Sequence, residues 1–412
     1  MDAYEFYRVL APAVVEVRCG HTSVSLPRPL QDALNTTFPV LPFYVRVIDG
    51  KPYVLRDMSA TGGKLAGLEL LSINGVRASK MVHALEDATS VDGRIDTARE
   101  YRISGWRFAT GIVRVLGITG PYHVSLWDNE THKEYRAKLD GEPLPRLVAM
   151  QAAAFPQDSE PDHNADLDFL DNGAIARLTI RGFYGFADTA RTLTIGEFIH
   201  ASFDAIRVRG SSTLVIDLRN NTGGEDEFGR ILLSYLVDRP FTYYDDLVIN
   251  KRVFDFDRYA DEEIDIPAAG VELRSDGRFH AVGHPNWGTQ QPGTPGFAGK
   301  VIILINGGSF STTSEFLSHV ADRHRATFVG EESGGAYFGN TSGFMPVIVL
   351  PNTKLQLRIP LMTYYLAVRG PHDATRGIVP DVKVEPDIDD LIAGRDRAME
   401  KALALARGDA RT

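Results

Sequence analysis

Two stretches of the chain share one pattern: an apolar run, a polar turn and then apolar residues at helical spacing. The first covers residues 213–226 and the second covers residues 301–316. A short continuous apolar run is typical of a strand buried on both faces, whereas apolar residues three and four positions apart indicate one face of a helix. Each stretch therefore predicts a strand, a tight turn and a helix in succession.

The turn of the second stretch places Ser311 directly before the predicted helix. Acyl-transfer enzymes hold a nucleophile in this position, because the backbone amides and the helix dipole stabilise the oxyanion that develops. The alternative is structural: Ser309, Ser311, Thr312 or Thr313 can simply cap the helix.

The turn of the first stretch contains two adjacent glycines, Gly223 and Gly224. Glycine allows a backbone to approach a ligand closely, so these residues and the amide of Thr312 are candidate oxyanion-hole donors. The alternative is a tight strand-to-helix turn without a catalytic role.

Four segments together resemble the serine peptidase family that contains the C-terminal-processing (tail-specific) proteases and the tricorn core. They are Asp-Leu-Arg-Asn-Asn-Thr-Gly-Gly (217–224), Ser-Phe-Ser-Thr-Thr-Ser-Glu-Phe (309–316), Val-Gly-Glu-Glu-Ser-Gly-Gly (329–335) and Gly-Ile-Val-Pro-Asp-Val (377–382). The resemblance covers residues 173–385 well and the N-terminal part more loosely. It implies an α/β fold with a Clp protease/crotonase-like layered sheet-and-helix core and a PDZ-like module inserted near the N-terminus. It also implies a peptide or unfolded protein as substrate, without a cofactor or metal.

One departure from the family pattern concerns the general base. Ser-Lys members carry a lysine in the loop where this chain has Ala336, and residues 301–353 contain no lysine. The tricorn-like branch uses histidine, and His21 lies in a Gly-His-Thr segment that resembles the one preceding the core in tricorn-like bacterial members. A neutral imidazole with a pKa near 6.5 can accept a serine proton. The resemblance therefore implies Ser311 as nucleophile and His21 as base; an ordinary surface or core histidine is the alternative.

The third catalytic residue is the least defined. Tricorn-like sites order the histidine with an acidic residue, usually a glutamate shortly before the closing Gly-Val-x-Pro-Asp segment. That position is Ala374 here, and the adjacent Asp373 is the predicted acid. Glu331 and Glu332 are the alternatives.

Composition narrows the possible functions. The chain has 412 residues, enough for two or three domains, and its formal net charge of −10 argues against a nucleic-acid partner. A single cysteine, Cys19, cannot form an internal disulfide or a cysteine-based zinc site. A catalytic pair of Cys19 and His21 is disfavoured, because the sequence shows nothing that would activate the thiol except that His21 is close by. A metal hydrolase is disfavoured because no His-Glu-x-x-His motif occurs, and an α/β-hydrolase because no Gly-x-Ser-x-Gly motif occurs.

The cellular setting is only partly indicated. The first residues lack a basic segment followed by an apolar one, so we expect no signal peptide in the given chain, and no apolar run is long enough for a membrane span. The family resemblance implies an exported enzyme, periplasmic or extracellular. The sequence gives no oligomeric state.

We predict four regions. They are an N-terminal segment with the predicted catalytic histidine (1–40), a PDZ-like module (41–145), a linker (146–172) and a serine peptidase core (173–412). Within them the patterns predict hairpins at 43–55 and 344–360, paired strands in 121–140, helices at 79–88 and 195–206, and an amphipathic terminal helix at 387–407.

The alternative to an enzyme is a binding protein. A non-catalytic protein that binds peptides or hydrophobic ligands can keep the same fold, as retinoid-binding relatives do. The joint presence of Ser311, His21 and the glycine pair favours an enzyme.

Overall fold

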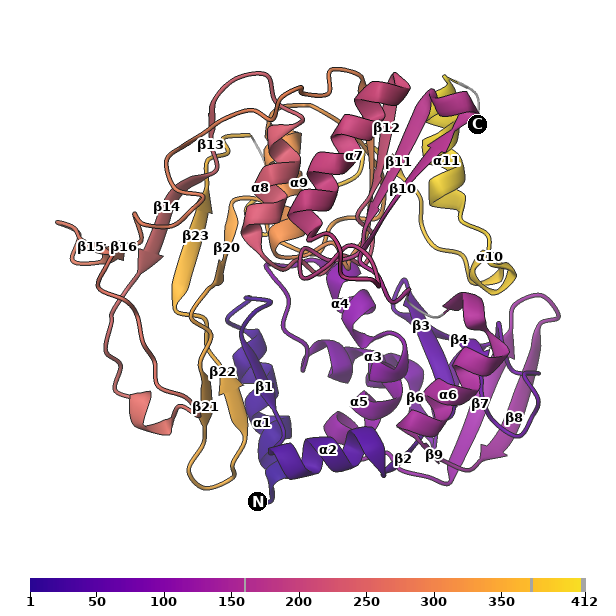
Figure 1. Ribbon diagram of the computed structural model, residues 1–412. Coiled ribbons are helices and arrows are strands. Elements are labelled where there is room, and N and C mark those ends of the chain that lie inside the picture. Colours follow the sequence, from indigo (N-terminus) through magenta and orange to yellow (C-terminus); the bar gives the residue numbers. More distant parts are fainter. Residues whose placement is uncertain (159–160, 371–372, 409–412) are drawn as a thin grey trace.

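The computed structural model describes residues 1–158, 161–370 and 373–408. The helices are α1 (Ala3–Val15), α2 (Arg28–Thr36), α3 (Ala78–Glu86), α4 (Asp96–Ile103), α5 (Trp106–Leu116), α6 (Leu144–Ala154), α7 (Ile195–Arg209), α8 (Asp226–Ser234), α9 (Thr312–Asp322), α10 (Ile388–Ala393) and α11 (Arg397–Arg407), with short 3-10 turns at Pro156–Asp158, Asp171–Gly173 and Asp257–Tyr259. We call residues 1–158 the N-terminal lobe, in the lower part of Figure 1, and the later described residues the core lobe, mostly above it. None of the helices in these described ranges has the length and apolarity needed to cross a membrane.

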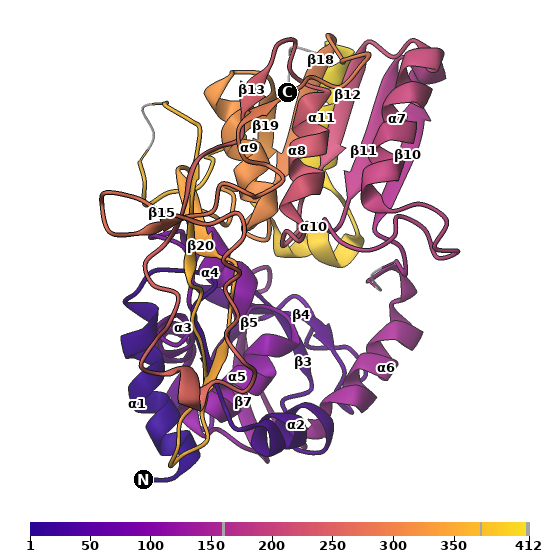
Figure 2. The same ribbon diagram turned by 60° about the vertical axis from the view of Figure 1, so that its left-hand side comes forward.

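The centre of the core lobe is a six-stranded sheet with the order β10-β11-β12-β18-β19-β24. Its strands are β10 (Ala165–Leu170), β11 (Ile175–Ile180), β12 (Thr213–Asp217), β18 (Lys300–Ile305), β19 (Thr327–Gly330) and β24 (Val382–Lys383). β10 runs antiparallel to β11, and all the other neighbours are parallel. Helices α7, α8 and α9 cover one face and α11 covers the other, so the sheet is the middle of three layers (Figures 1 and 2).

Strand β18 shows why its sequence is uninterruptedly apolar. Val301, Ile303 and Ile305 pack in the core beneath α7–α9, whereas Ile302 and Leu304 pack in the core beneath α11. Both faces of the strand are thus buried, which removes the alternation of apolar and polar residues seen in half-exposed strands. The predicted layered α/β fold class is confirmed.

The N-terminal lobe contains a separate sheet with its own hydrophobic core. The strands β3 (Phe43–Ile48), β4 (Lys51–Asp57), β5 (Glu69–Ile73), β7 (Tyr122–Asp128) and β8 (Lys133–Leu139) follow this order across the sheet, β6 (Val76–Arg77) pairs with β5, and β2 (Pro39–Val40) pairs with β9 (Glu142–Pro143). The hairpin predicted at 43–55 and the strand pair predicted in 121–140 are confirmed. The PDZ-like character of the module stays a prediction.

A third group of strands connects the lobes. An antiparallel sheet of the core lobe contains β14 (Tyr244–Ile249), β15 (Glu272–Leu273), β16 (Phe279–His280), β20 (Gly339–Ser342) and β23 (Met362–Leu366), and β13 (Phe241–Thr242) pairs with β17 (Thr289–Gln290). From it the hairpin β21 (Val347–Val349) and β22 (Gln356–Arg358) extends down to the N-terminal lobe, where β22 pairs with β1 (Ser23–Ser25) (Figure 1). Leu355 is fully buried in the N-terminal core. The strand that follows His21 is therefore held by a hairpin of the core lobe.

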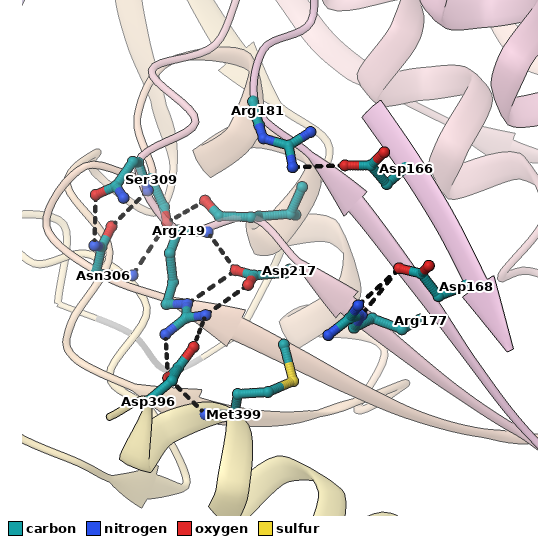
Figure 3. Close-up of polar contacts among 12 residues, drawn as sticks. Asp166, Asp168, Arg177, Arg181, Asp217, Arg219, Asn306, Ser309, Asp396 and Met399 are labelled. Atoms are coloured by element: carbon teal, nitrogen blue, oxygen red, sulfur yellow. Dashed lines mark hydrogen bonds and ion pairs between the residues drawn. The ribbon is translucent and has the colours of Figure 1, made fainter. Parts of the chain in front are cut away.

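The linker predicted at 146–172 is wrong over residues 146–154, which belong to α6, and over residues 165–170, which form β10. Asp166 pairs with Arg181 (2.6 Å) and Asp168 with Arg177 (2.8 Å), as Figure 3 shows. These aspartates give the stretch its polar composition, but they are ion-pair partners on an edge strand. Ala165, Leu167 and Phe169 alternate with these aspartates, but the acidic surroundings made the strand resemble an exposed connection.

The single terminal helix predicted at 387–407 is also wrong, because the chain forms two helices there. Gly394 adopts a left-handed conformation (φ 69°) and ends α10. Asp396 then caps α11 and accepts hydrogen bonds from both terminal nitrogens of Arg219 (2.7 Å each). Arg219 also binds Asp217 at the end of β12, so it fastens α11 to the central sheet (Figure 3).

Candidate active site

The polar turns that follow β12 and β18 form one unit. These strands are parallel neighbours, so their carboxyl ends meet at the same edge of the sheet. The amide of Asn220 donates to Asn306 Oδ1 and the side-chain amide of Asn306 donates to Asn220 Oδ1, both at 2.9 Å. Ser309 is fully buried, and its Oγ donates to the carbonyl of Leu218 at 2.8 Å (Figure 3). Ser309 is therefore a structural bridge between the two turns.

Ser311 lies at the N-cap of α9 in a strained conformation, with φ 58° and ψ −128°. A residue other than glycine in such a region costs about 1–3 kcal/mol, and this strain is common at functional sites. The Ser311 side chain makes no capping hydrogen bond to the helix. Its Oγ instead lies 3.0 Å from His21 Nε2. The capping interpretation therefore does not describe Ser311.

His21 reaches Ser311 from the loop between α1 and β1, although 290 positions separate the two residues in sequence. Its ring packs on Phe310, with 4.6 Å between the ring centroids, and the Arg102 guanidinium lies 4.4 Å from the Phe310 centroid. A side chain at Gly20 would place its Cβ 2.7 Å from Phe310, so glycine is needed there. His21 Nδ1 is buried and has no hydrogen-bond partner among the described residues.

The environment of His21 favours its neutral form. Burial, followed by the positive charges of Arg102 and Arg358, lowers its pKa to about 4. The imidazole is therefore neutral at physiological pH and free to accept a proton. Its low pKa makes it a weak base in the resting protein.

The two glycines approach the nucleophile through their backbones. A Cβ added to Gly223 would lie 2.6 Å from Ser311 Cβ, and one added to Gly224 would lie 2.1 Å from the carbonyl oxygen of Phe183. The amide of Gly223 already donates to Asn221 Oδ1 (3.0 Å), whereas the carbonyl of Gly224 accepts the Thr312 hydroxyl (2.7 Å). Both positions therefore need glycine for steric reasons, whatever their role in catalysis.

The structure does not join the predicted acids to His21. Asp373 is exposed and accepts hydrogen bonds from the amide and the hydroxyl of Thr375, both at 2.8 Å. Glu332 is buried, where it binds Arg376 and a backbone amide, and Glu331 lies 3.6 Å from Arg46. Each of these carboxylates thus has other partners.

An acid that the sequence analysis missed lies beside His21. Asp92 is 4% exposed and accepts hydrogen bonds from the amides of Gly20 (2.6 Å) and Ala336 (3.3 Å). Its carboxylate, a ring nitrogen of His21 and Cys19 Sγ lie within 4.8 Å of one another. In the sequence, Asp92 precedes Gly93, and an Asp-Gly pair indicates only a turn.

Cys19, His21 and Asp92 are residue types that bind metals, but their surroundings oppose a cation. The buried Arg102 guanidinium acts electrostatically on all three residues. It would repel a divalent ion from the same space. The Cys19 thiol also has another partner, since it donates a hydrogen bond to the carbonyl of Thr341 at 3.5 Å.

Comparisons with known proteins place this geometry in context. Residues 174–384 match the sequence model of Peptidase family S41. A mutant of CPAF has a similar structure, with a TM-score of 0.64 and 15% identity over 100% of this chain and 90% of that chain. Mature CPAF complexed with lactacystin has a TM-score of 0.59 and 15% identity, over 99% of this chain and 88% of that chain. The photosystem II D1 C-terminal processing protease has a TM-score of 0.42 and 16% identity, over 96% of this chain and 87% of that chain. No curated protein sequence matches the chain.

Proposed function

Because this chain belongs to peptidase family S41 and is a serine hydrolase, we propose that it cleaves peptide bonds with Ser311 as nucleophile and His21 as general base. The 3.0 Å separation between Ser311 Oγ and His21 Nε2 supports this assignment most directly. The strained backbone of Ser311 and the absence of a capping bond support it independently.

The proposed reaction begins with proton transfer from Ser311 Oγ to His21 Nε2 as Oγ attacks the carbonyl carbon of the scissile peptide. The imidazolium then gives this proton to the nitrogen of the leaving amine, and an acyl-enzyme forms on Ser311. A water molecule, activated by His21 in the same manner, releases the acyl group and restores the serine.

We assign stabilisation of the oxyanion to the backbone amides at the start of α9 and in the glycine turn. The amide of Thr312 is at the first position of α9, where the helix dipole favours negative charge. Of the two glycines, Gly224 is the better candidate donor, because the amide of Gly223 is engaged by Asn221. Gly223 then serves mainly to leave room for Ser311.

Substitution of Ser311 tests the proposal. We expect Ser311→Ala to lower the kcat for peptide hydrolysis by about 10⁴-fold or more and to abolish fluorophosphonate labelling, as deletion of a nucleophile does. His21→Ala should have an effect of similar size, because the two residues act as one unit. Thermal stability should change little, since the Ser311 hydroxyl makes no capping contact.

Ser202→Ala is a suitable control. Ser202 is a buried serine on α7 whose hydroxyl has no hydrogen-bond partner in the described ranges, so the same chemical change there should leave activity unaffected. Wild-type protein that neither hydrolyses peptides nor reacts with a fluorophosphonate would instead favour a binding protein on this fold. Full activity in His21→Ala would exclude His21 as the base.

A further inference from the structure

The proposed reaction creates a positive charge in an unfavourable place. When His21 accepts the serine proton, the imidazolium is repelled by two cations, the half-buried Arg102 on α4 and the exposed Arg358 on β22, and it is itself largely shielded from water. Such an imidazolium needs a nearby anion, because like charges and the loss of water both raise its free energy. The acidic residues predicted from the sequence are bound to other partners.

Asp92 is the acidic side chain that the described structure brings close to His21. Its oxygen, a ring nitrogen of His21 and Cys19 Sγ lie within 4.8 Å of one another. The amides of Gly20 and Ala336 hold the Asp92 carboxylate in place. Burial raises the pKa of Asp92, and the two amides and Arg102 partly oppose this shift because they favour the charged carboxylate. Gly20 directly precedes His21, so Asp92 also fixes the backbone that carries the imidazole.

The loop of Asp92 packs against the segment where the family resemblance had placed the acid. The carbonyl of Thr375 accepts the amide of Arg94 at 2.8 Å, and a Cβ at Gly93 would lie 2.1 Å from the same oxygen. Asp373 in turn holds Thr375 through two hydrogen bonds. Asp373 thus supports the loop, and Asp92 extends from that loop into the site.

We propose that Asp92 is the residue that positions His21, by accepting a hydrogen bond from His21 Nδ1 and by offsetting the charge of the imidazolium. The inference rests on the proposed Ser311–His21 chemistry. It accounts for the buried Nδ1 atom, which has no partner among the described residues. The Asp92 carboxylate lies within 4.8 Å of a ring nitrogen of His21, which can exceed the length of a hydrogen bond. Catalytic hydrogen bonds are often long before substrate binds and shorten in the complex, or are bridged by one water.

A purely structural role for Asp92 gives different expectations. In that case its two amide contacts hold the loop, and its replacement lowers stability and the folded fraction without changing the chemistry of His21. The proposed role instead requires a change in kcat and in the titration of His21 in fully folded protein.

The experiment compares Asp92→Asn with two matched variants. Asp373→Asn changes the acid predicted from the sequence, and Asp322→Asn changes another carboxylate that fixes two backbone amides, those of Arg369 and Gly370, at the far end of α9. For Asp92→Asn we expect kcat to fall by about 10²–10⁴-fold with KM changed less than about threefold, since loss of the orienting aspartate of a triad acts mainly on kcat. The other two variants should keep kcat within about threefold, because the side-chain oxygen of asparagine can still accept the hydrogen bonds that each aspartate receives on Oδ1.

A second measurement does not depend on catalysis. We expect ¹⁵N NMR of histidine-labelled Ser311→Ala protein to show His21 protonated at Nδ1 when neutral. Adding Asp92→Asn should change the tautomer distribution and lower the pKa of the imidazole, because an anion is removed. These results remain interpretable if the protein does not hydrolyse peptides, so a failure of the proposed function and a failure of this inference can be told apart.

Two outcomes would overturn the inference. One is folded Asp92→Asn protein with wild-type kcat and unchanged His21 titration. The other is a loss of kcat in Asp373→Asn that equals or exceeds the loss in Asp92→Asn.

Discussion

His21 has an unusual setting for a general base, because its folded-state pKa of about 4 lies below the ordinary value of 6.5. Since only the neutral imidazole accepts the serine proton, the acid limb of kcat/KM reports the pKa of the free enzyme. We therefore predict that kcat/KM stays near its maximum from pH 7 to below pH 6 and falls only at lower pH. A pH–rate profile with a small peptide substrate measures this.

The pH experiment needs a control for stability and a variant that changes the pKa of His21. The folded protein disfavours protonation of His21, so stability is lost as the pH falls from about 6.5 toward 4, and circular dichroism must accompany the rate measurements. Replacing Arg358 with Gln removes one of the two cations that lower the pKa of His21 and should move the acid limb to higher pH. An acid limb at or above pH 6.5 in the wild type would contradict the prediction.

The residues of the site differ in how far sequence could identify them. Ser311 and His21 lie in short local motifs, and the structure brings the two together. Asp92 could not be found in this way, because its proximity to His21 depends on the packing of loops from both lobes. The hydrogen bond from the Gly223 amide to Asn221 could not be predicted from the sequence either. A pair of glycines shows where a backbone can approach a ligand, but not which of the two amides is free to bind it.

At the scale of elements, the hairpin of β21 and β22 holds the segment that carries His21. β22 pairs with β1 two residues after His21, and Leu355 anchors the hairpin in the N-terminal core. We predict that Leu355→Ala destabilises the protein by about 2–5 kcal/mol and also lowers kcat per folded molecule, because β1 loses its support.

Leu139→Ala is the matched control for the hairpin. Leu139 lies on β8 and belongs to the same core, with 3% exposure, but β8 does not pair with β1. Urea unfolding gives the stability of both variants, and kcat is measured where both are fully folded. Equal values of kcat per folded molecule would show that the hairpin does not position His21.

A second element-scale feature is a pair of carboxylates between α8 and α9, the partly exposed Asp226 and the buried Glu315. The hydroxyl of Tyr244 lies 2.7 Å from Asp226 Oδ2 and 2.8 Å from Glu315 Oε2, and the Asn340 side-chain amide donates to Glu315 Oε1 at 2.7 Å. One hydroxyl proton cannot serve both carboxylates, so a proton on Glu315 completes the network. Burial and the charge of Asp226 raise the pKa of Glu315 to about 7.

We predict that Glu315→Gln reduces the pH dependence of stability. The folded state holds the Glu315 proton more tightly than the unfolded state, so wild-type stability decreases as the pH rises from about 4.5 to about 7. Glutamine cannot ionise and can still donate to Tyr244. Melting temperatures between pH 5 and 8 measure the difference, with the exposed Glu227→Gln on α8 as control. Parallel curves for the wild type and Glu315→Gln would contradict the prediction.

Elements were predictable where one periodicity dominated. The strands of 213–217 and 301–305 are buried on both faces, and the hairpins at 43–55 and 344–360 alternate around clear turn residues. β10 was missed because its alternate aspartates made an edge strand resemble a polar connection. The break at Gly394 was missed because the apolar spacing of the terminal segment continues past it.

At the scale of the whole molecule, the site lies between two lobes with separate hydrophobic cores. Around the site the lobes meet through polar contacts, such as the Thr97 hydroxyl with the carbonyl of Glu332 (2.9 Å) and Arg46 with Glu331 (3.6 Å). The exception is the β21–β22 hairpin of the core lobe, whose Leu355 is buried in the N-terminal core. Lobes whose cores are otherwise independent can unfold separately. The proposed catalytic mechanism needs both lobes, because His21 and Asp92 belong to one lobe and Ser311 to the other.

This arrangement predicts that Ser311 loses its reactivity when the N-terminal lobe unfolds, whether or not the core lobe remains folded. Trp106 and Trp127 lie in the N-terminal lobe and Trp287 in the core lobe, so a Trp287→Phe variant reports the N-terminal lobe alone by tryptophan fluorescence. In a urea titration of this variant, we expect fluorophosphonate labelling to fall together with the fluorescence transition. Far-UV circular dichroism follows the core lobe as well. Labelling that persists beyond the fluorescence transition would mean that Ser311 is activated without His21, and the base would then have to come from the core lobe.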